Sequence, residues 1–229
     1  MASVFPTIYL IHLRKKKAMN LKGYCSVLAL GISIATFGQN SKGDIELGVN
    51  SGINFSSVGN NEGNSDVSTA FNLSASADYF FSSRWSLKSK LIYDKKGWDN
   101  GFVENSSFDP SLQDSYKTNF NLNYLTIPVL ASWHFGGKRN WYLHFGPYAG
   151  VLLNAKETTF DTKLTKVFNT MDFGASLGVG VKIPLSEKLK LSLEYDEQVG
   201  FIDIFKENSG SSITNSRTSF NIGLNFMLK

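Results

Sequence analysis

The chain has 229 residues, a length that suits one domain with a short appendage. Its formal charge is +4, but the first 38 residues hold five of the 23 Lys and Arg and none of the 19 Asp and Glu. The basic balance therefore belongs to the N-terminal segment and gives no reason to expect a nucleic-acid partner. The one cysteine, Cys25, lies in the same segment, so we expect no disulfide and no thiol chemistry in the remainder.

The first 38 residues have the features of a secretory signal peptide. Basic residues precede an apolar run at 24–37, and small residues (Thr36, Gly38) precede Gln39. We predict cleavage between Gly38 and Gln39, with translation starting at Met1 or at Met19. An N-terminal membrane anchor is the alternative, but the run is shorter than the roughly 18 to 20 residues that a spanning helix needs.

From residue 45 onward, large apolar residues alternate with small or polar ones in strand-length segments. A period of two predicts β-strands. We expect eight, at residues 45–55, 69–81, 84–98, 120–135, 141–155, 171–183, 188–199 and 218–228. Tight turns at 82–83, 136–140 and 184–187 alternate with long polar connections at 56–68, 99–119, 156–170 and 200–216.

This alternation predicts an all-β fold, an eight-stranded antiparallel up-and-down transmembrane β-barrel with both termini periplasmic. The domains would be the signal peptide (1–38), a short periplasmic segment (39–44) and the barrel (45–229). An eight-stranded barrel has room inside only for side chains or one small ligand. The aromatic-rich face is too bulky for that space, whereas the opposite face is rich in Gly, Ser and Asn. We therefore expect the aromatic face to meet outer-membrane lipid, rather than the interior of a soluble barrel.

The predicted inward face carries charges of both signs. Buried charges are costly unless they are paired or wetted, so we favour a polar network that plugs the lumen over a narrow conduit for water or small ions. The residues of this predicted network are Glu46, Asp78, Lys88, Lys90, Asp94, His134, His144, Asp172, Lys182, Lys190, Glu194 and Asp196.

A Ser-His-acid triad built on one of the two inward histidines would make the barrel a lipid hydrolase. If the turn centres near Lys138, His134 faces Tyr142 and His144 faces Ser132. Ser132 would then point inward, away from the lipid-facing rim where such an enzyme needs its nucleophile. We therefore expect hydrogen-bonded lumen histidines and no catalytic, metal or cofactor site, since two histidines without a third clear ligand are a weak metal signal.

Two further features concern backbone shape and surface. Pro128 and Pro147 interrupt the fourth and fifth predicted strands, where proline usually marks a bulge. The loop 99–119 carries Phe102, Phe108, Pro110 and Tyr116 among polar residues, either as a partner-binding loop or as a solvated one. Its acidic residues do not follow a calcium-loop spacing.

Several motifs carry a resemblance to a known family. Residues 123–129 (NYLTIPV) and 145–156 (FGPYAGVLLNAK) are similar to the "YL-x-IP" and "GPY-x-G-x-LL-x-AK" strands of the PorT-family outer membrane β-barrel proteins of Bacteroidetes. Residues 172–174 and 193–195 also match later strands of that family. The resemblance implies the same barrel and, through the founding member, a link to a secretion machinery. It brings no catalytic residues.

Together these features predict a non-catalytic protein integral to the outer membrane. Its role would be structural, surface-interacting or secretion-linked, with lipid as one partner and a protein partner at the extracellular loops or in a secretion machinery. The alternatives are a narrow, porin-like pore for small solutes and a lipid-modifying enzyme.

Overall fold

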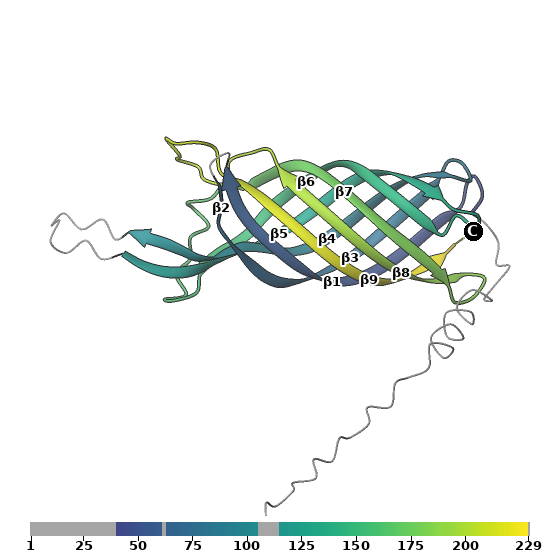
Figure 1. Ribbon diagram of the computed structural model, residues 1–229, viewed down its shortest axis with the longest axis horizontal. Coiled ribbons are helices and arrows are strands. Elements are labelled where there is room, and N and C mark those ends of the chain that lie inside the picture. The colour runs from purple at the N-terminus through teal and green to yellow at the C-terminus, as the bar shows by residue number, and fades with distance from the viewer. Residues whose placement is uncertain (1–39, 61–62, 105–114, 229) are drawn as a thin grey trace, which may run out of the picture. The chain divides into compact units, whose positions relative to one another are not determined.

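The computed structural model describes residues 40–60, 63–104 and 115–228, which form one antiparallel β-barrel (Figure 1). Eight long strands close into a ring in the order β1-β3-β4-β5-β6-β7-β8-β9, and β9 pairs back onto β1. The eight-stranded up-and-down prediction is confirmed. The strands are β1 (Ile45–Asn60), the two-residue β2 (Gly63–Asn64), β3 (Asp66–Phe80), β4 (Trp85–Glu104), β5 (Ser115–Phe135), β6 (Trp141–Glu157), β7 (Met171–Pro184), β8 (Leu189–Gly200) and β9 (Thr214–Met227). Among the described residues, no helix has the length and apolarity to cross a membrane.

The two faces of the sheet differ as the sequence predicts. Phe71, Leu91 and Val179 point outward and are 74%, 47% and 38% exposed. The inner face needs small residues because side chains on paired strands crowd each other there. A Cβ at Gly52, for example, would lie 2.1 Å from Oδ1 of Asn221. The apolar face is therefore the outer one.

The strands are longer than predicted at the long-loop end. Part of the predicted loop 99–119 is a paired extension of β4 and β5, in which Phe102 lies opposite Lys117 (Figure 1). The register shifts between Trp98 and Gly101, and Asn100 takes a positive φ of 53° there. This bulge lets the hairpin continue past a point where the alternation in the sequence is lost. Phe108 and Pro110 lie outside the described residues.

The prediction that Pro128 and Pro147 mark bulges is wrong. Pro128 lies opposite Tyr148 and Ala131 opposite Phe145, so the β5–β6 register is the same on both sides of the prolines. Proline lacks an N–H group but its fixed φ is compatible with an extended strand, so it costs a ladder bond without requiring an extra residue. The bulges lie elsewhere, between Val67 and Asn72, Trp98 and Gly101, and Asn123 and Tyr124.

An apolar cluster fills the inside of the barrel at its long-loop end. We call it the apolar cap. Trp98 stacks on Phe120 with ring centroids 4.4 Å apart, and Phe168 packs edge-on against Trp98. The loops 158–170 and 201–213 meet here through a bridge between Phe168 and Phe205. The buried members of the cap are Val58, Trp98, Phe120, Leu122, Tyr124, Leu152, Ala155, Phe168 and Ile204.

Candidate functional site in the barrel lumen

The structure places all twelve sequence-predicted lumen residues on the inner face, and all are buried. It adds Lys96 and Arg217, which the sequence analysis missed. Both were detectable from strand parity, since Lys96 lies two residues after Asp94 and Arg217 two residues before the inward Ser219. The lumen network then has six Lys or Arg and six Asp or Glu, so the formal charges cancel.

The first layer of the network lies near the short turns. Glu46 of β1 accepts hydrogen bonds from Lys182 of β7 and from Lys190 of β8, the latter at 2.8 Å. Lys182 also donates to Asp78 of β3 at 2.9 Å. Lys190 donates to Oδ1 of Asn40 at 2.6 Å. Two ammonium groups and two carboxylates therefore neutralise each other across the width of the barrel.

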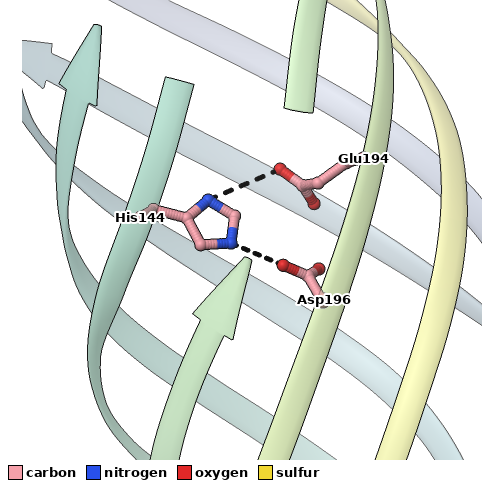
Figure 2. A group of neighbouring side chains, drawn as sticks. All are labelled: His144, Glu194 and Asp196. Carbon is pink, nitrogen blue, oxygen red and sulfur yellow. Dashed lines mark hydrogen bonds and ion pairs between the residues drawn. The ribbon is translucent and has the colours of Figure 1, made fainter. Parts of the chain in front are cut away.

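The middle layer joins β4, β6 and β8. Lys88 donates to Glu194 at 2.7 Å, and Lys90 bridges Glu194 and Asp196, the latter at 2.7 Å. The ring of His144 lies between the two carboxylates, as Figure 2 shows. Its Nε2 is 2.5 Å from Oδ1 of Asp196, and its Nδ1 is 3.7 Å from Oε2 of Glu194.

His144, Glu194 and Asp196 have the chemistry of metal ligands, and their ligand atoms lie within 4.8 Å of one another. Their arrangement fits an ion-pair network better. The two carboxylates face different nitrogens of one ring. A metal ion bound to either nitrogen at about 2.0–2.1 Å would therefore lie next to only one of the two carboxylates. Lys90 already bridges both carboxylates.

The third layer lies below the apolar cap. Arg217 of β9 donates to Asp94 of β4 at 3.2 Å. Lys96 donates to Asp172 of β7 at 3.0 Å, and its ammonium lies over the ring of Tyr148, 4.7 Å from the centroid. These contacts span strands that are not neighbours in the sheet, so they fill the bore rather than line its wall.

The register predicted for the histidines is confirmed, since His134 pairs with Tyr142 and Ser132 with His144. Nε2 of His134 lies 2.9 Å from Oγ of Ser86, a serine that the sequence analysis did not single out. Nδ1 of His134 and Oγ of Ser132 have no hydrogen-bond partner among the described residues. The described residues therefore hold no Ser-His-acid arrangement around either histidine.

Glu157 is the last residue of β6, beyond the apolar outward residues of the strand, and it anchors the loop that follows. Its carboxylate accepts hydrogen bonds from the backbone amides of Thr159, Phe160 and Thr162 at 2.7, 2.9 and 2.8 Å. Desolvation raises the pKa of Glu157, but the amide hydrogen bonds outweigh it and the pKa is lowered to about 2. The sequence analysis missed this residue because a bulge on β6, between Leu152 and Asn154, reverses the parity of the last residues of the strand.

A closed ring of eight strands with an apolar outer face and a charged interior defines an integral β-barrel membrane protein. Residues 37–206 match the family described as outer membrane protein beta-barrel domain, and the chain belongs to that family. This membership implies an integral outer-membrane location. No curated protein matches the chain.

The chain is similar to several solved structures. OprG from Pseudomonas aeruginosa has 12% sequence identity and a TM-score of 0.50, with 83% of this chain and 98% of that chain covered. Neisserial surface protein A has 16% identity and a TM-score of 0.45, covering 79% and 96%. Ail, the attachment invasion locus protein of Yersinia pestis, has 12% identity and a TM-score of 0.41, covering 81% and 99%. At 12% identity the likeness to OprG concerns the fold alone.

Proposed function

We propose that this protein is a closed, non-catalytic outer membrane barrel whose work is done at its long-loop end. It serves as a structural, surface-interacting or secretion-linked accessory protein. The signal peptide (1–38) directs export, the segment 39–44 and both termini are periplasmic, and the barrel (45–229) spans the membrane. The alternation of short and long connections supports this topology, because transmembrane barrels have short periplasmic turns and longer extracellular loops.

The filled lumen is the observation that carries the proposal. Three layers of paired charges occupy the bore, and the apolar cap covers them at the long-loop end. A passing solute would have to break buried ion pairs, and breaking one costs about 3–5 kcal/mol. This arrangement favours a plug over a porin-like pore.

The long-loop end also offers an exposed aromatic surface. Phe102, Phe160 and Phe201 are 66%, 69% and 69% exposed. Phe160 packs edge-on against Tyr116, with ring centroids 5.0 Å apart, which joins the loop after β6 to the β4–β5 hairpin. Exposed aromatic side chains of this kind support contact with a protein partner. The resemblance to PorT-family barrels favours a component of a secretion machinery.

Planar-bilayer recording tests whether the barrel is closed. The refolded protein, with insertion verified by its heat-dependent gel mobility, should give a flat current trace. Reproducible unitary steps over many insertions would overturn the closed-barrel proposal in favour of the narrow pore.

Crosslinking in intact outer membranes tests the interacting surface. The wild-type protein should capture reproducible neighbours, and the double variant Phe160→Ser with Phe201→Ser should lose them. Leu185→Ser is the matched control, because Leu185 is an exposed apolar residue (50%) at a short turn. Equal recovery from all three proteins would argue against a partner at the long-loop end.

A further inference from the structure

The apolar band on the outside of the barrel ends abruptly on β4, β5 and β6. Tyr93 pairs with Leu125 and Leu125 with Val151, which gives an apolar outward row. The next outward row toward the long loops is polar, with the bulged Leu153 exposed beside it. It consists of Lys95, Asn123 and Asn154. A one-row change from apolar to polar side chains places the membrane–water boundary between these rows.

A groove of about 710 Å³ crosses this boundary on the outer surface. On the side toward the membrane the groove is lined by Phe71 and Tyr93. On the side toward the long loops it is lined by Lys95 and Lys156. Gly97 and Asn121 pair in the row that also contains Lys156.

The two lysines differ in what they contact. Lys156 forms an ion pair with Asp161 at 2.8 Å, in which the Asp161 side chain is 76% exposed. An exposed pair of this kind contributes about 0–1 kcal/mol, so a stronger anion replaces Asp161 at little cost. The ammonium of Lys95 has no hydrogen bond or ion pair with the part of the chain that the structure describes.

The polar row also contains amides that suit a headgroup. Nδ2 of Asn123 donates to Oδ1 of Asn154 at 2.8 Å, and Asn121 lies in the same groove. A ligand with hydroxyl or phosphate oxygens beside an acyl chain matches this combination of cations, amides and apolar wall.

On the far side of the barrel an outward acidic side chain lies on the short-turn side of two exposed apolar residues, Val199 and Phe201. Glu197 of β8 points outward there, between Leu177 and Thr218 on the neighbouring strands. The cationic groove is therefore a local feature of β4, β5 and β6.

We infer that this groove binds a phosphorylated lipid of the leaflet on the long-loop side. The phosphate lies between Lys95 and Lys156, and an acyl chain runs down the barrel wall along Phe71 and Tyr93. Only the assignment of the groove to one leaflet rests on the proposed function, because that assignment uses the proposed membrane topology.

Native mass spectrometry of the full mature chain in detergent micelles tests the inference. The probes are phosphatidic acid and phosphatidylcholine with identical acyl chains, at equal mole fraction. We expect the protein to retain phosphatidic acid preferentially. Lys95→Gln combined with Lys156→Gln should weaken that binding about tenfold, since the two charge-assisted contacts are worth about 1.4 kcal/mol together. Binding of phosphatidylcholine should not change.

The matched control is Lys138→Gln combined with Lys188→Gln, which removes the same charge from exposed residues of the short turns. It should bind phosphatidic acid like the wild type. The inference is overturned by equal retention of the two lipids, by an unaffected groove variant, by an equal loss in the control, or by complete displacement with inorganic phosphate, which would indicate an anion site without lipid.

These outcomes are separable from those of the proposed function. Binding in micelles does not depend on whether the lumen conducts or on which leaflet is involved. Loss of the phosphatidic acid preference would leave the closed barrel in place, whereas unitary conductance would remove the closed barrel and leave the groove.

Discussion

Replacing Lys182 by Met should strongly destabilise the barrel. Lys182 is the one cation within 4.0 Å of Asp78 among the described residues, whereas Glu46 keeps Lys190 as a second partner. Asp78 is 3% exposed, so water cannot take the place of the lost ammonium. A buried charge left without its partner costs about 3–5 kcal/mol, and we expect the free energy of unfolding to fall by about that amount.

A double-mutant cycle separates the ion pair from a general loss of packing. Asp78→Asn alone leaves Lys182 bound to Glu46 and should cost less than Lys182→Met. The double variant removes both charges of the pair, so its cost should fall below the sum of the single costs by about 1–3 kcal/mol. Urea unfolding in lipid vesicles, followed by the gel mobility of the folded barrel, gives the three values. Strict additivity would show that Lys182 and Asp78 are not coupled.

Two other predictions concern the loop anchor and the inner glycines. The lowered pKa of Glu157 means that its anchoring contribution is fully present above pH 4.5 and is lost as pH falls toward 2. The amide NMR signal of Thr162 should therefore titrate with a midpoint near 2, and Glu157→Gln should abolish that titration; a midpoint near 4.5 would contradict the anchor. A Cβ at Gly178 would lie 2.2 Å from Nε2 of His144, so Gly178→Ala should cost about 1–3 kcal/mol in urea unfolding. At Gly137 a Cβ meets nothing within 4 Å, and Gly137→Ala should change stability by less than about 0.5 kcal/mol; equal effects would refute the steric argument.

The ring of strands was predictable because each strand has one lipid-facing and one inward side. Outward residues such as Phe71 and Leu73 follow the period of two without interruption, which fixes both the secondary structure and the face. Arg217 was missed for a simpler reason. The predicted last strand began at 218, whereas β9 begins at Thr214. Polar residues near the end of a strand have the composition of a loop, so the start of the strand was placed too late.

The pairing of charges across the lumen was not predictable from the sequence. Glu46 and Lys182 are 136 residues apart and lie on β1 and β7, which are not neighbours in the ring. Their meeting depends on the tilt and stagger of the whole barrel, which no local pattern encodes. The bulge between Asn123 and Tyr124 was not predictable either. It turns Glu157 inward, and no proline or glycine in the sequence marks its position.

The lumen charges also specify the register of the strands. Lipid tails are as apolar as the outer face. Contact between that face and lipid therefore contributes little free-energy difference between one strand register and another. A slip of β8 by one residue would turn Lys190, Glu194 and Asp196 toward lipid and break their contacts with β1, β4 and β6. A lysine at the bilayer midplane costs about 2–4 kcal/mol, and the pairs left behind add their own penalty. The buried network therefore acts against misregistered barrels, a role that it performs whether or not a solute, lipid or protein is bound.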